Sequence, residues 1–138
     1  MIVNEVFFQK QADYDFNTHT MINALIIDDE VDICYLLSGM LLSKNIRANY
    51  VNTITAAIKE LEDNDPQIIF LDNHLPDGLG LDYINQIKHS HPASKLVMIT
   101  AHDTASDRHK AFSEGVDYFI AKPFSKDTLY KTVDQLID

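Results

Sequence analysis

Several features that would define other protein classes are scarce in this chain of 138 residues. Its single cysteine, Cys34, cannot form an internal disulfide, and its apolar neighbours in a helical pattern predict a position in the core. No apolar run approaches the roughly 20 residues of a membrane span. The first residues, MIVNEVFFQK, have neither a basic start nor a sustained apolar stretch, so we expect no secretory signal and a cytoplasmic protein.

Basic residues are also few. The chain has 11 Lys and Arg residues against 21 Asp and Glu residues, a formal charge of −10. Proteins that bind nucleic acid directly neutralise its phosphates with basic side chains, so this balance argues against direct nucleic-acid binding. A composition of 46% apolar and 23% charged residues is that of a globular protein, and the length predicts one domain.

Short apolar, β-branched runs alternate with longer segments of helical period from residue 23 onward. This alternation is typical of an α/β fold, in which helices cover both faces of a doubly wound parallel sheet. The five predicted strands are Ala24–Asp28, Arg47–Val51, Ile68–Leu71, Lys95–Thr100 and Tyr118–Ala121. The five predicted helices are Val31–Lys44, Thr55–Asn64, Leu79–Ser90, Ser106–Glu114 and Lys126–Ile137, and Asn52 or Thr53 is the expected cap of the second.

Residues 1–22 precede this alternation, and we treat them as an N-terminal extension to a domain at residues 23–138. Three apolar residues near the start form one weak helical stripe, but the period is then lost. The extension is either a loosely ordered tail or an extra helix docked on the domain or on a neighbouring chain.

Polar residues follow the predicted strands at their carboxyl ends. Asp28 and Asp29 end the first strand, Asp72 follows the third, Thr100 ends the fourth and Lys122 follows the fifth. In open α/β sheets these ends line one crevice, where ligands bind. Three carboxylates, one hydroxyl and one ammonium leave the crevice negatively charged, so a hard divalent cation is the expected partner, and Mg²⁺ is the commonest choice.

A metal alone does not require Lys122 and Thr100. A phosphoryl group can bridge Mg²⁺, an ammonium and a hydroxyl, and one carboxylate can then accept it as an acyl phosphate. Two simpler interpretations stay open at this point. The acids after the first strand could cap a helix, and the sequence PDGLG could be only a turn.

Taken in order, these residues resemble the receiver domains of bacterial two-component response regulators. The resemblance covers about residues 23–138 and rests on four short motifs. They are Asp28-Asp29, DNHLPDGLG with Asp72, Pro76 and Gly80, Thr100-Ala101, and Lys122-Pro123-Phe124. The resemblance implies a flavodoxin-like sheet with strand order 2-1-3-4-5. It also implies a phosphorylation-controlled signalling switch that accepts one phosphoryl group, rather than an enzyme with turnover.

The resemblance further implies a role for each residue in the crevice. Asp72 would be the phosphoacceptor. Mg²⁺ would be held by the side chains of Asp29 and Asp72, by Asp28 through water, and by the backbone carbonyl of His74. Thr100, Ala101 and Lys122 would bind the phosphoryl oxygens, Thr100 and Phe119 would form the switch, and the Lys122-Pro123 bond would be cis. Phe119 has no hydroxyl to satisfy, so we expect it to favour a buried position more than tyrosine would.

The implied partners are proteins: a histidine kinase or histidine phosphotransfer protein as donor, a downstream target, and a second copy in a homodimer. The homodimer would form through Ser106–Glu114, Tyr118–Ala121 and Lys126–Ile137. Because the last predicted helix ends at the chain end, we expect a single-domain regulator; the receiver part of a longer regulator is the alternative.

A phosphohydrolase with an aspartyl nucleophile is the rival enzyme. Haloacid-dehalogenase-like phosphatases need a second acid two positions after the nucleophile, where this chain has His74. His74 and His102 lie two residues after Asp72 and Thr100, at positions that in receiver domains flank the path of the attacking water. We therefore predict that their rings slow hydrolysis of the phosphorylated form.

Overall fold

A five-stranded parallel sheet forms the centre of the computed structural model, which describes residues 21–137. The sheet order is β2-β1-β3-β6-β7. Because β6 and β7 are the fourth and fifth strands of this sheet in chain order, the predicted order 2-1-3-4-5 is confirmed. The strands are β1 Ile22–Ile27, β2 Ile46–Val51, β3 Ile68–Leu71, β6 Lys95–Thr100 and β7 Tyr118–Ala121.

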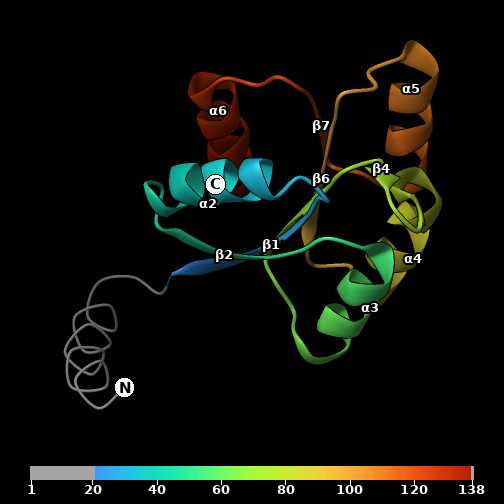
Figure 1. The fold of residues 1–138 in the computed structure, drawn as a ribbon, viewed down its shortest axis with the longest axis horizontal. Coiled ribbons are helices and arrows are strands. Elements are labelled where there is room, and N and C mark those ends of the chain that lie inside the picture. The colour runs from blue at the N-terminus through green and yellow to red at the C-terminus, as the bar shows by residue number, and fades with distance from the viewer. Residues whose placement is uncertain (1–20, 138) are drawn as a thin grey trace.

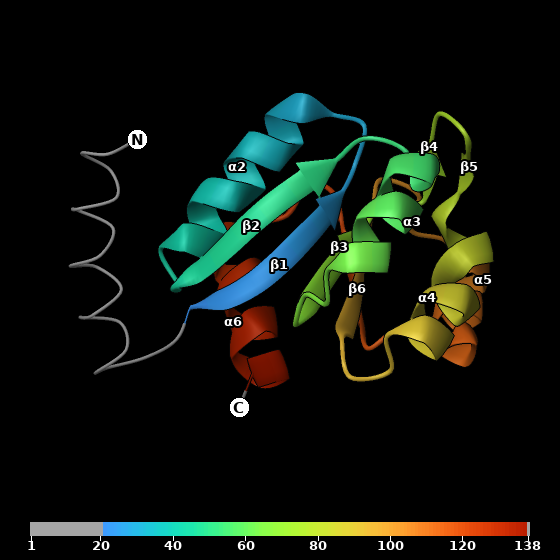
Figure 2. The same ribbon diagram turned by 90° about the horizontal axis from the view of Figure 1, so that it is seen from below.

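Five helices cover the two faces of the sheet, as the doubly wound fold requires. Figure 2 shows α2 and α6 on one side and α3, α4 and α5 on the other. The helices are α2 Val31–Leu42, α3 Ile54–Asp63, α4 Ile84–Ser90, α5 Ala105–Glu114 and α6 Lys126–Ile137. None of these described helices is long and apolar enough to cross a bilayer.

The core has two halves, one on each face, because alternate strand residues point to opposite sides of a sheet. Leu25 and Ile27 of β1 pack with residues of α3 and α4, whereas Ala24 and Ile26 pack with α2 and α6. All four residues of β3 are buried, which explains its continuous apolar run IIFL. Cys34 is fully buried in the α2 half of the core, as predicted.

Helix ends agree with the local signals. The Thr53 side chain accepts a hydrogen bond from the Ala56 N–H at 3.0 Å and caps α3. Gly115 adopts a left-handed conformation, with φ of 119°, where α5 ends. The first strand is Ile22–Ile27 instead of the predicted Ala24–Asp28, and residues 1–20 of the predicted N-terminal extension lie outside the described part of the chain.

The third predicted helix begins too early. Instead of a helix from Leu79, the structure has a small hairpin, β4 His74–Leu75 with β5 Gly78–Leu79, and then a 3₁₀ turn at Gly80–Tyr83 before α4. A Cβ at Gly80 would lie only 2.4 Å from the Asp72 carbonyl oxygen, so the chain folds back tightly against the end of β3. The hairpin therefore places the residues after Asp72 over the carboxyl edge of the sheet (Figure 1).

Candidate functional site

The predicted polar residues lie at the carboxyl ends of four neighbouring strands of the sheet, β1, β3, β6 and β7. The strand ladder continues past the strand ends: the Asp28 N–H donates to Val51 O at 3.1 Å, and the Asp72 N–H to Ile27 O at 2.9 Å. At the other side of the crevice, the Lys122 N–H donates to Thr100 O at 2.8 Å. These backbone bonds hold the residues that bear the carboxylates and the ammonium in fixed positions.

The carboxylates form one cluster. Asp28, Asp29 and Asp72 each offer an oxygen, and these oxygens lie within 4.8 Å of one another. Asp28 and Asp72 are buried, with 3% and 6% of their surface exposed, whereas Asp29 is exposed. Charged oxygens at this spacing, open to solvent on one side, fit a hard divalent cation such as Mg²⁺.

Lys122 balances part of this negative charge. Its Nζ donates to Asp28 Oδ2 at 2.8 Å and to Glu30 Oε1 at 2.9 Å, and lies 3.7 Å from Asp72 Oδ1. Burial lowers the pKa of Lys122, but the hydrogen bonds to Asp28 and Glu30 and the charge of Asp72 outweigh it, so the net shift is upward. The ammonium therefore stays charged at the floor of the crevice.

Asp72 is the carboxylate most affected by its surroundings. Burial raises its pKa to about 6, and the charge of Asp28 adds to the rise, while Lys122 and the Asn73 N–H partly oppose it. Near neutral pH the group is ionised yet more basic than an ordinary aspartate. A buried, basic carboxylate beside an ammonium is a suitable nucleophile for an electrophile that carries negative charge.

Thr100 and Phe119 lie on adjacent strands, β6 and β7. Thr100 is fully buried, and its Oγ1 accepts a hydrogen bond from the His102 N–H at 3.2 Å, whereas Ala101 is exposed. Phe119 is 8% exposed and lies under Arg108, whose guanidinium carbon is 4.6 Å from the ring centroid. In this structure the aromatic ring is thus held inward.

The two histidines predicted to act together are neighbours. The rings of His74 and His102 have centroids 3.8 Å apart and planes tilted by 36°. His74 belongs to β4 and His102 to the loop after β6, and both residues are exposed. The Lys122-Pro123 peptide bond in the next loop is cis.

Two residues of the site escaped the sequence analysis. Glu30 contacts Lys122, and Asp77 joins the β4–β5 hairpin to α3 by accepting hydrogen bonds from Ile54 N and Thr55 N at 2.8 and 2.9 Å. These bonds lower the pKa of Asp77. Glu30 belongs to the same acidic run as Asp28 and Asp29, which was the one available signal; nothing near Asp77 in sequence indicates α3.

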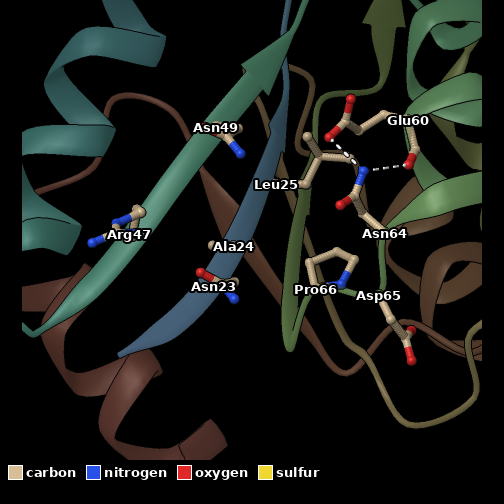
Figure 3. Close-up of a pocket in the computed structure, with 9 residues that line it drawn as sticks. All are labelled: Asn23, Ala24, Leu25, Arg47, Asn49, Glu60, Asn64, Asp65 and Pro66. Atoms are coloured by element: carbon tan, nitrogen blue, oxygen red, sulfur yellow. Dashed lines mark hydrogen bonds between the residues drawn. The ribbon is translucent and has the colours of Figure 1, made fainter. Parts of the chain in front are cut away.

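A separate polar hollow of about 250 Å³ lies between β1, β2 and α3 (Figure 3). Asn23, Arg47 and Asn49 line it from the strands, and Glu60 and Asn64 line it from the end of α3. The Asn64 side chain donates to Glu60 O and Oε2 at 3.1 and 3.0 Å, so part of its polar lining is already paired. It contains none of the predicted site residues.

Comparison with known proteins agrees with the geometry. Regulatory protein LuxO of Vibrio vulnificus is 32% identical over 112 residues, which cover 81% of this chain and 25% of the relative. Nitrogen assimilation regulatory protein NtrX of Azorhizobium caulinodans is 33% identical over 116 residues, covering 83% and 26%. The chain therefore spans about a quarter of the length of these curated relatives.

Among solved structures, a two-component response regulator from Clostridium difficile superposes with a TM-score of 0.81 at 27% identity, covering 85% of this chain and 96% of that one. The family model of the response regulator receiver domain matches residues 24–134, which include every residue of the crevice. The chain therefore belongs to the family of response regulator receiver domains.

Proposed function

We propose that Asp72 accepts the phosphoryl group by which this receiver domain switches state. The observation that carries the proposal is the position of Asp72: buried, basic, 3.7 Å from Lys122 and within 4.8 Å of two further carboxylates. The carboxylate oxygen attacks phosphorus, a P–O bond forms, and the P–N bond of a donor phosphohistidine breaks. The leaving imidazole keeps the electron pair of that bond and takes up a proton.

Each neighbour has a part in this transfer. Lys122 and Thr100, with the backbone of Ala101, bind the phosphoryl oxygens, and the burial of Asp72 keeps bulk water from the acyl phosphate. Asp29 and Asp72 would hold Mg²⁺ through their side chains, Asp28 through water, and His74 through its backbone carbonyl. The oxygens of the three aspartates lie within 4.8 Å of one another. When bound, this ion supplies positive charge that offsets the charge of the phosphoryl group.

We infer that the chain acts stoichiometrically, in the cytoplasm, with proteins as partners. A histidine kinase or histidine phosphotransfer protein is the donor. The readout is the surface of α5, β7 and α6, because Thr100 and Phe119 connect the crevice to it. Phe112 of α5 is 45% exposed there, beside a hollow lined by Tyr118, Lys131 and Gln135. A downstream target, or a second copy in a homodimer, binds this surface.

Phosphorylation by a small phosphodonor tests the proposal. Acetyl phosphate with Mg²⁺ should add one base-labile phosphoryl group per chain, detected by intact mass, and Asp72→Ala should abolish it. Asp63→Ala, at the exposed end of α3, is the matched control and should be labelled like the parent. Labelling of Asp72→Ala at the parent level, or uptake of more than one phosphoryl group per chain, would refute a single acceptor at Asp72.

A further inference from the structure

Glu30 lies where the acidic crevice meets the first turn of α2. It occupies the N-cap position of α2, yet its side chain makes no capping hydrogen bond. Its carboxylate reaches across the crevice to the Lys122 ammonium instead, at 2.9 Å. It is not one of the three carboxylates that share a cation-sized space. Capping and metal binding therefore leave the role of this side chain unexplained.

The contacts of Lys122 are unequal. Asp28 and Glu30 each lie within hydrogen-bond distance of its Nζ, at 2.8 and 2.9 Å, whereas the nearest Asp72 oxygen is 3.7 Å away. The ammonium is thus drawn toward the β1–α2 side of the crevice. An ammonium has only three N–H donors, and two of them point to Asp28 and Glu30. A phosphoryl group on Asp72 has to compete for these donors.

Asp28 and Glu30, the two carboxylates that accept hydrogen bonds from Lys122, differ in burial. The Asp28 side chain is 4% exposed and Lys122 is 9% exposed, so their pair is part of the floor of the crevice. The Glu30 side chain is 60% exposed and can turn into water when Lys122 leaves it. Glu30 is therefore the partner that can be given up when Lys122 turns to the phosphoryl oxygens.

We propose that Glu30 is a positioning residue that restrains Lys122 in the unphosphorylated state and thereby weakens binding of the phosphoryl group. The inference rests on the proposed function, because it takes Lys122 as a ligand of the phosphoryl oxygens. Exposed ion pairs contribute roughly 0.2 to 1 kcal/mol, which corresponds to an effect of about 1.4- to fivefold on affinity.

Titration with beryllofluoride, a phosphoryl mimic, in the presence of Mg²⁺ tests the proposal. Glu30→Gln removes both the charge and the strong contact, and Glu30→Asp keeps the charge but is too short to make the same contact. Both should bind beryllofluoride about 1.4- to fivefold more tightly than the parent. Asp32→Asn, an exposed acid in the first turn of α2, removes the same charge without a contact to Lys122 and should change affinity much less.

The outcomes separate the possible failures. Unchanged affinity in Glu30→Gln, or an equal gain in Asp32→Asn, overturns the role of the contact. If Glu30→Gln binds beryllofluoride more tightly and Glu30→Asp does not, the effect is due to charge alone. This result also overturns the role of the contact. Equal binding by the parent and Asp72→Ala refutes the proposed function itself.

A second readout does not depend on the mimic. In the free proteins, the Lys122 side-chain ammonium signal in ¹H–¹⁵N spectra should change in both Glu30 variants and stay the same in Asp32→Asn. An ammonium signal that is unchanged in the Glu30 variants contradicts the restraint.

Discussion

Replacing Asp72 with asparagine should make the metal-free protein more stable at neutral pH. The change removes one charge from a cluster of three carboxylates and keeps the size of the side chain. Lys122 keeps its hydrogen bonds to Asp28 and Glu30, so the variant leaves no buried charge without a partner.

The pKa of Asp72 sets the expected magnitude. Raising the pKa of a carboxyl from 3.8 to about 6 corresponds to a cost of about 3 kcal/mol for its ionised form in the folded protein. Asp72 is only 6% exposed, so solvent screens little of this cost. Loss of the longer contact to Lys122, at 3.7 Å, opposes part of the gain. We expect Asp72→Asn to raise the free energy of unfolding by about 2 kcal/mol at pH 7.

The pH dependence has a definite sign. The pKa of Asp72 is higher in the folded state than in the unfolded state, so the folded state binds more protons between about pH 4 and pH 6. The free-energy cost of holding ionised Asp72 in the folded protein is therefore absent below about pH 4 and complete above about pH 6 to 7. The stability difference between variant and parent should shrink toward zero as the pH falls through this range.

Urea unfolding followed by circular dichroism, with a chelator and at several pH values, measures this difference; the chain has no tryptophan for a fluorescence assay. Asp63→Asn is the control, because exposed substitutions of this kind usually change stability by less than about 0.5 kcal/mol. Saturating Mg²⁺ should reverse the order, since a ligand at a hundred times its Kd stabilises the folded parent by about 2.7 kcal/mol. An Asp72→Asn variant that is less stable than the parent at pH 7 without Mg²⁺ would refute the reasoning.

Two further predictions concern lifetime and switching. Replacing His74 with Gly and His102 with Ala should shorten the lifetime of the phosphorylated form, because the paired rings then no longer crowd the approach of water to Asp72. A decay time course at fixed pH and Mg²⁺ measures this lifetime, and equal decay rates in variant and parent would contradict the shielding. Arg108→Ala should remove about 0.5 to 1 kcal/mol of cation–π stabilisation from the inward position of Phe119. Amide exchange along β7 should then be faster in unphosphorylated Arg108→Ala than in the parent, while Arg108→Lys should behave more like the parent. Unchanged exchange in Arg108→Ala would show that the Arg108–Phe119 contact does not hold the ring inward.

Local pattern was sufficient to predict most of the fold. Strands such as β3 are apolar at every position because both faces of a parallel sheet are covered, and this run is visible in the sequence without any tertiary information. Helix caps are also local. Thr53 caps the start of α3 and Gly115 caps the end of α5, each through hydrogen bonds with residues a few positions away. Interactions over such short separations repeat in many proteins and leave a readable sequence signal.

The hairpin after Asp72 could not be predicted in this way. Its two strands are each two residues long, too short to show a period. It is held by Asp77 on the start of α3 and by the close approach of Gly80 to the Asp72 carbonyl. These contacts depend on where α3 and β3 lie in space.

By itself, the sequence determined the kind of chemistry at the crevice. Asp28, Asp72 and Lys122 directly follow strands, and Thr100 ends one. Because parallel strands present their carboxyl ends together, these residues bring acids, an ammonium and a hydroxyl to one edge of the sheet. Only the tertiary structure decided how these groups share their contacts. Glu30 and Lys122 are 92 residues apart in sequence, and His74 of β4 meets His102 from the loop after β6. The pairing of long side chains depends on differences of about an ångström in backbone position, and the periodicity of a sequence carries no information at that scale.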